Sequence, residues 1–118
     1  MITFNELTEK INNNEIPKEE WANYLDKSKL GIAGIVIFKL IKERYCNEEI
    51  IERLVDFSKL LHGYKFLGPW QYGHVAIATL LLVQDEEAMK RYLEICEELN
   101  ANDKFLVTNF IESEVYKD

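Results

Sequence analysis

The side chains of this 118-residue chain that could carry chemistry are its two histidines, its two cysteines and its many carboxylates. His62 and His74 are separated by eleven residues, without the close His-x-x-x-His spacing that is typical of zinc ligands. Cys46 and Cys96 have neither a metal-ligand nor a redox spacing, which favours small buried or half-buried thiols in a reducing compartment. We therefore expect no metal site and no cofactor.

Nucleophilic catalysis has no better support in the sequence. Neither Ser58, Ser113 nor either cysteine stands in a recognisable motif with a histidine and an acid. Gly31 and Gly34 lie inside an apolar run with no preceding strand, which does not fit a phosphate-binding loop. An enzyme that uses His74 with a nearby acid is the least favoured alternative, and the sequence predicts a protein that is not an enzyme.

The overall charge points to the kind of partner. Twenty-one acidic and 14 basic residues give a net charge of −7. This disfavours direct binding to nucleic acid or to an anionic membrane, for which a basic patch is the usual footprint. It favours a basic protein partner, although such a charge can also serve only to keep a protein dispersed. The N-terminus lacks a secretory pattern and the apolar runs are short, so we expect a cytoplasmic protein with no membrane span.

The acidic residues are concentrated in two segments. Residues 85–99 contain six acidic and two basic side chains, whereas residues 29–46 contain one acidic and four basic ones. Glu49 with Arg53 and Glu87 with Arg91 are acid-first pairs four residues apart, which weakly stabilise a helix. No local partner is evident for the remaining acids of interest, which are Glu52, Asp56, Glu94, Glu97 and Glu98. The pattern predicts a joint acidic face, with an ordinary solvated helix surface as the alternative.

Aromatic residues gather in one irregular segment, Tyr64–Tyr72, which reads YKFLGPWQY. Gly68-Pro69 should break the chain there, and aromatic side chains on loops are over-represented among binding hot spots. We expect Tyr64 and Tyr72 to be exposed. Trp70 has two interpretations, an exposed anchor or a plug between helices.

Two apolar runs should position these features. Gly31–Ile41 and Gly73–Val83 are apolar almost all round, which predicts buried helices over Lys29–Tyr45 and Gly73–Gln84. Each is followed by an amphipathic segment with an N-cap residue and acids in its first turn. These segments predict helices over Glu48–His62, capped by Asn47, and over Glu86–Leu99, capped by Asp85.

Three further helices complete an all-α fold of about seven helices in a single domain, residues 1–118. Thr3, with Glu6 three residues later, should cap a first helix that ends at the asparagines from position 12. A second helix should run from Ile16-Pro17 to about Asp26, with Ser28 capping the next. A last helix should open at Asn102 or Asp103, and the segment from position 114 should fray.

The central four helices form an internal repeat, at about residues 30–62 and 73–99. When Gly31 is set on Gly73, Leu40 falls on Leu82; after a four-residue gap, the acid pairs that follow each N-cap also coincide. The period of about forty residues resembles that of HEAT-like repeats, which are stacked antiparallel helical pairs. The proline and the aspartate-valine pattern of well-formed HEAT units are missing, so a plain helical bundle is the alternative.

In size, charge and architecture, though not in any motif, the chain resembles the small acidic immunity proteins that neutralise bacterial nuclease toxins. That resemblance implies a protein whose acidic surface covers a basic active site. The candidate partner-binding residues are Glu52, Asp56, Tyr64, Trp70, Tyr72, Glu87, Glu94, Glu97 and Glu98. An alternative function is a small-ligand-binding or regulatory domain, with an apolar cavity between the central helices near Gly31, Gly34 and Ala76.

Overall fold

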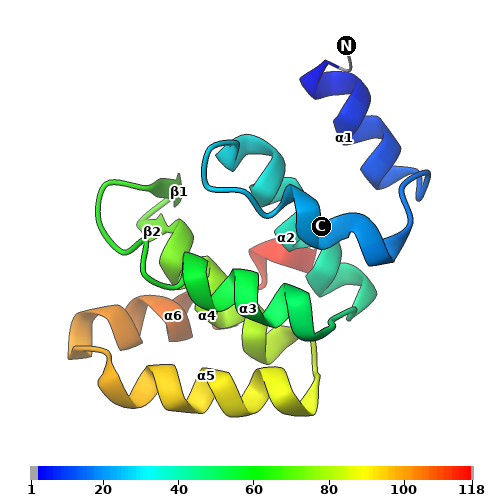
Figure 1. The fold of residues 1–118 in the computed structure, drawn as a ribbon. Helices are drawn as coiled ribbons and strands as arrows, with labels where there is room; N and C mark the ends of the chain where they lie inside the picture. Colours follow the sequence, from blue (N-terminus) through cyan, green and yellow to red (C-terminus); the bar gives the residue numbers. More distant parts are fainter. Residues whose placement is uncertain (1–2, 118) are drawn as a thin grey trace.

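The computed structural model describes residues 3–117, which form an all-α fold with one short hairpin (Figure 1). The helices are α1 (Phe4–Asn12), η1 (Lys18–Tyr24), α2 (Leu30–Glu43), α3 (Glu48–Phe57), α4 (Tyr72–Leu82), α5 (Glu86–Glu98), α6 (Ala101–Ser113) and η2 (Val115–Lys117), of which η1 and η2 are 3₁₀ helices. The strands are β1 (Lys65–Leu67) and β2 (Trp70–Gln71). The predicted fold class is confirmed.

Helix α4 is the centre of the fold. Its residues from Tyr72 to Leu80 are all buried, and α2, α3, α5 and α6 pack around it. Helix α2 is the second apolar element, with eight buried residues among its 14. Both runs of apolar sequence are therefore buried helices, because a helix that is apolar on every side must be covered on every side. Helix α3 packs mainly on α4 and on η1.

Three predicted N-caps are confirmed. The Thr3 hydroxyl accepts a hydrogen bond from the Glu6 backbone N–H at 3.1 Å and also donates one to the Glu6 carboxylate. Asn47 caps α3 by accepting from the Ile50 N–H at 2.9 Å, and Asp85 caps α5 by accepting from the Ala88 N–H at 3.0 Å. Each cap pairs one of the backbone donors that the first helical turn leaves free.

Two predicted starts are wrong. Ser28 does not cap α2, because its N–H and its hydroxyl both donate to Asp26 within a turn, and Lys29 stands at the N-cap. Helix α6 begins before Asn102, at Ala101, because the side chain of Asn100 accepts from the Asp103 N–H at 2.8 Å.

The helix predicted to reach His62 ends at Phe57. The segment beyond it turns, and the Leu60 carbonyl accepts from the Gly73 N–H at 2.9 Å instead of continuing α3. The two backbones approach so closely that a Cβ at Gly73 would lie 2.8 Å from the Leu60 carbonyl carbon and oxygen. Close approach to a backbone is the reason this position needs glycine.

The segment predicted as irregular forms a small hairpin. Lys65 pairs with Gln71 and Leu67 with Trp70 in an antiparallel register. Gly68, at φ +54°, makes the turn with Pro69. The Tyr72 hydroxyl donates to the Leu30 carbonyl at 2.7 Å, which ties the end of the hairpin to the start of α2.

Aromatic rings lie against the glycines of α2, near which an apolar cavity was predicted. A Cβ at Gly34 would lie 2.9 Å from the Phe66 ring, and one at Gly31 would lie 3.0 Å from the Phe4 ring. Phe66 packs edge-on against Tyr72 with ring centroids 4.8 Å apart, and Ala76 is completely buried. The glycines therefore accommodate side chains, not a neighbouring backbone. A pocket of about 290 Å³ does lie beside Gly31, but its lining comes from α1, α2 and their N-caps and not from α4.

Candidate protein-binding surface

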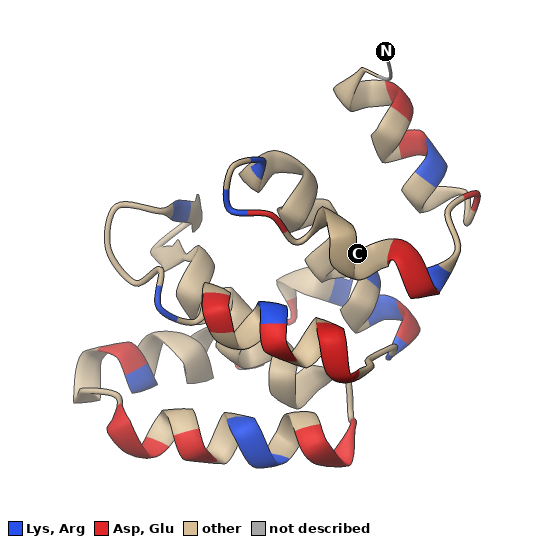
Figure 2. Ribbon diagram, viewed as in Figure 1, with Lys and Arg blue, Asp and Glu red and all other residues tan. Residues whose placement is uncertain are grey.

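The N-termini of α3 and α5 lie side by side and bring two acidic first turns together (Figure 2). Glu48 and Glu49 open α3, and Glu86 and Glu87 open α5. Acidic residues are favourable at these positions because the N-terminus of a helix carries a partial positive charge. The same local preference that starts each helix therefore concentrates negative charge on one side of the molecule.

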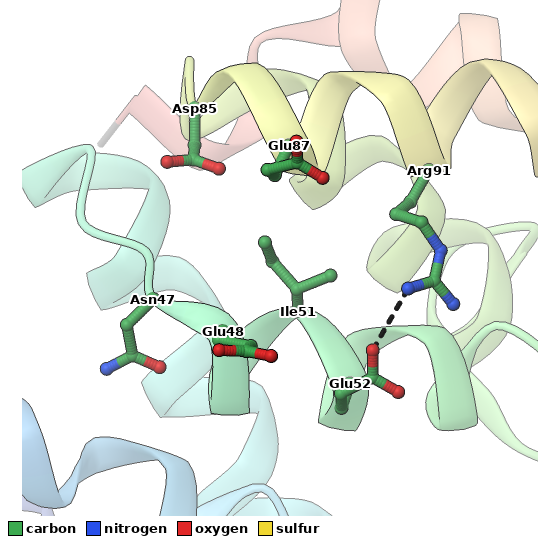
Figure 3. Close-up of a pocket in the computed structure, with 7 residues that line it drawn as sticks. All are labelled: Asn47, Glu48, Ile51, Glu52, Asp85, Glu87 and Arg91. Carbon is green, nitrogen blue, oxygen red and sulfur yellow. Dashed lines mark hydrogen bonds and ion pairs between the residues drawn. The ribbon is translucent and has the colours of Figure 1, made fainter.

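A pocket of about 410 Å³ lies between these two helices (Figure 3). It is lined by Asn47, Glu48, Ile51 and Glu52 from α3 and its cap, and by Asp85, Glu87 and Arg91 from α5 and its cap. Ile51 points between the helices, and the polar side chains surround it. The lining carries four carboxylates and one guanidinium, so this surface suits a cationic group with an apolar portion.

Arg91 connects the two helices. One of its terminal nitrogens lies 2.9 Å from a Glu52 carboxylate oxygen on α3, and its Nε lies 3.5 Å from Glu94 on α5. The predicted pairing of Arg91 with Glu87 is not among these contacts. Because the partners are largely exposed, each pair contributes about 0–1 kcal/mol and mainly fixes the Arg91 side chain in the pocket wall.

Three acids for which no partner was evident in the sequence are paired, two of them across elements and Glu94 within α5. Glu52 and Glu94 contact Arg91, and Asp56 contacts Lys27 from the loop before α2 at 2.9 Å. The predicted Glu49–Arg53 pair is confirmed at 3.8 Å. Within residues 3–117, Glu87, Glu97 and Glu98 are the candidate acids that form no ion pair. We call these three the unpaired acids of α5.

The aromatic candidates divide between surface and core. Tyr64 is 40% exposed, as expected. Tyr72 is buried, so its predicted exposure is wrong; burial also raises the pKa of its phenol. Trp70 is buried edge-on against Phe110 with ring centroids 5.2 Å apart, which settles its two interpretations in favour of the plug.

The hairpin and the pocket lie at opposite ends of α4. Tyr72, which follows the hairpin, is the first residue of α4, whereas Asp85 follows its last turn. Eleven helical residues span about 16 Å at 1.5 Å per residue. Tyr64 is therefore remote from the pocket, and a contact that includes both would have to be broad.

His74 does have an acid beside it, although the sequence could not say which one. Its Nε2 lies 2.8 Å from the Asp103 carboxylate, and its Nδ1 accepts from the Gln71 backbone N–H at 3.0 Å. With Nδ1 as acceptor, the ring proton of neutral His74 belongs on Nε2, where it donates to Asp103. Both residues are buried, and both ring nitrogens are engaged. The pair joins α4 to α6, whereas a general base needs a nitrogen within reach of a substrate.

The cysteines are both free and half-buried. Burial raises the pKa of the Cys46 thiol to about 12 and raises that of Cys96 as well, so both favour the unreactive protonated form. Among residues 3–117, no three His, Cys, Asp or Glu side chains converge as metal ligands would. The helices of this same range are all too short or too polar to cross a membrane.

Comparison of the chain with protein-family models, with curated proteins and with solved structures found no match in any of the three. The class that the fold defines is a small acidic all-α domain.

Proposed function

We propose that this chain is a non-catalytic protein-binding domain that uses the acidic surface of α3 and α5 to bind a basic protein. The supporting observation is the pocket between the two helices, where four carboxylates surround an apolar floor and only one cation is present. A basic partner would gain from this surface in two ways. Long-range attraction would speed its association, and cationic side chains would find partners in the unpaired acids of α5.

The specific partner that we propose is a nuclease-type toxin, which makes the chain an immunity protein. An enzyme that cleaves nucleic acid needs a basic cleft to bind phosphates, and such a cleft complements an acidic helical surface. The chain's net charge of −7 and its small size fit a protein that acts by covering another one. This assignment rests on general resemblance and on charge complementarity.

The test is affinity capture with the tagged chain in cell extract from its own source, washed at low and at high salt. We expect one stoichiometric basic protein that is released by high salt, since electrostatic association is screened by ions. The eluted protein should degrade nucleic acid when alone and lose that activity when the chain is added back. A captured protein that is acidic, or whose binding is unaffected by salt, would contradict the proposed surface. A basic protein without nuclease activity would contradict the toxin assignment alone.

A further inference from the structure

Helix α5 is only thinly covered by the rest of the fold. Of its 13 residues, Ala88 alone is buried, and α4 and α3 are its principal neighbours. Met89 is 39% exposed and Leu93 is 58% exposed. A single exposed apolar side chain is ordinary, so these two matter only as a pair.

Met89 and Leu93 form a continuous apolar stripe. They are four residues apart, so they lie one turn apart on the same side of α5. This side faces away from the flank on which Arg91 reaches α3. We call the two residues the Met89–Leu93 stripe.

Charged residues flank the stripe at both of its ends. Glu86 lies three residues before Met89, and Glu97 lies four residues after Leu93, so an acid stands at each end. Lys90 lies beside the stripe and is the basic residue on this side. The rim of the stripe therefore carries two acids and one base, and the net charge of −7 on the chain adds to its negative potential.

The charge of the rim decides between possible occupants. In a second copy of this chain, Glu86 and Glu97 would approach the same residues of the first copy, and each chain carries a net charge of −7. An anionic lipid surface would be repelled in the same way. A segment with apolar side chains on one face and lysine or arginine beside them would satisfy both the stripe and its rim.

We propose that the Met89–Leu93 stripe is a second contact for the same partner, on the side of α5 away from Arg91, and that it holds a basic amphipathic helix of the partner protein. This inference rests on the proposed function and replaces the loop aromatics as the source of the hot spot, since Trp70 and Tyr72 are buried. Apolar anchors within a charged rim are the arrangement in which a few residues supply most of the binding energy.

The experiment uses a fluorescein-labelled helical peptide of leucine and lysine with all leucines on one face, titrated with the full chain and followed by fluorescence anisotropy. A peptide of the same composition in scrambled order serves as the second probe. We expect saturable binding of the amphipathic peptide and at least about tenfold weaker binding of the scrambled one. Equal binding of the two would overturn the stripe as an apolar anchor.

Variants of the chain separate the stripe from the acidic surface. Leu93→Ser should weaken binding of the amphipathic peptide by about tenfold or more. The matched control is Phe105→Ser on α6, which removes another apolar side chain that is 64% exposed and should leave binding unchanged. An equal loss in both variants, or no loss in Leu93→Ser, would overturn the inference. Thermal unfolding of each variant checks that these exposed substitutions leave the fold intact.

A third variant, Glu87→Lys with Glu98→Lys, reverses two acids on the Arg91 flank, which lies on the other side of α5 from the stripe. It should leave binding of the peptide to the stripe largely unchanged and should lower capture of the basic protein from extract. Loss of peptide binding in this variant would place the peptide on the acidic surface and overturn the stripe, whereas unchanged capture would contradict the proposed function alone.

Discussion

Replacing Asp103 by alanine should destabilise the protein more than any exposed substitution in the same helix. The carboxylate is the acceptor for the Nε2–H of His74, and both side chains are buried. A buried donor that loses its partner costs about 1–3 kcal/mol. Loss of a negative charge in the first turn of α6 adds about 0.3–1 kcal/mol. Together these terms predict a loss of roughly 1.5–4 kcal/mol and a fall of roughly 5–20 °C in Tm.

Thermal and urea unfolding measured by circular dichroism would give both quantities. Asn102→Ala is the matched control, because Asn102 is exposed in the same helical turn and should change Tm little. Asp103→Asn keeps a carbonyl acceptor and should lose less stability than Asp103→Ala. Equal unfolding temperatures for Asp103→Ala and Asn102→Ala would show that the contact between His74 and Asp103 does not stabilise the fold.

Three further predictions concern the core and the thiols. Burial raises the pKa of Cys46 to about 12, so this thiol should react with iodoacetamide at pH 8 far more slowly in the folded protein than in urea. Equal reaction rates, measured by mass spectrometry, would contradict its burial. The free energy of unfolding should fall between about pH 9 and pH 12. Cys46 and Tyr92 each have a pKa of about 12 in the folded protein and lose their protons at lower pH when the chain is unfolded. A free energy of unfolding that stays constant over this range in urea titrations would contradict both pKa shifts. Gly73→Ala should lower the free energy of unfolding by about 1–3 kcal/mol, because the new Cβ would lie 2.8 Å from the Leu60 backbone. An unchanged urea unfolding curve would show that the structure relieves this contact without loss of stability.

Local sequence signals predicted most of the helices. The apolar runs of α2 and α4 had to be buried whatever their neighbours, and Thr3, Asn47 and Asp85 each cap a helix through a bond within three residues. Errors occurred where another local bond competed. Asp26 holds Ser28 in a turn, and Asn100 starts α6 before the more obvious candidates.

Long-range contacts could not be predicted from the sequence. Arg91 has acids at several helical spacings, and only the packing of α5 beside α3 selects Glu52, which is 39 positions away. The pairing of His74 with Asp103 likewise depends on how α6 folds back over α4. Tyr72 was expected on the surface because it follows a turn, yet its hydroxyl finds the Leu30 carbonyl, 42 positions away, and allows the ring to be buried.

The acidic pocket was partly visible in the sequence. Setting the two apolar runs on each other and then allowing a four-residue gap aligns Asn47-Glu48-Glu49 with Asp85-Glu86-Glu87, so both caps and both acidic turns coincide. If the two helices lie side by side, these residues must meet. That alignment was the available signal for Asn47, Glu48 and Asp85, which are not among the predicted partner-binding residues.

The measurement that tests the binding surface most directly is affinity capture with two charge-reversed chains. In the first, the unpaired acids Glu87, Glu97 and Glu98 are changed to lysine. In the second, three exposed acids on α1, η1 and α6, namely Glu9, Glu19 and Glu112, are changed to lysine, which alters the net charge equally. We predict that the second chain retains a basic protein at low salt as the unaltered chain does, and that the first chain loses it. Equal capture by both variants would contradict the assignment of binding to α3 and α5.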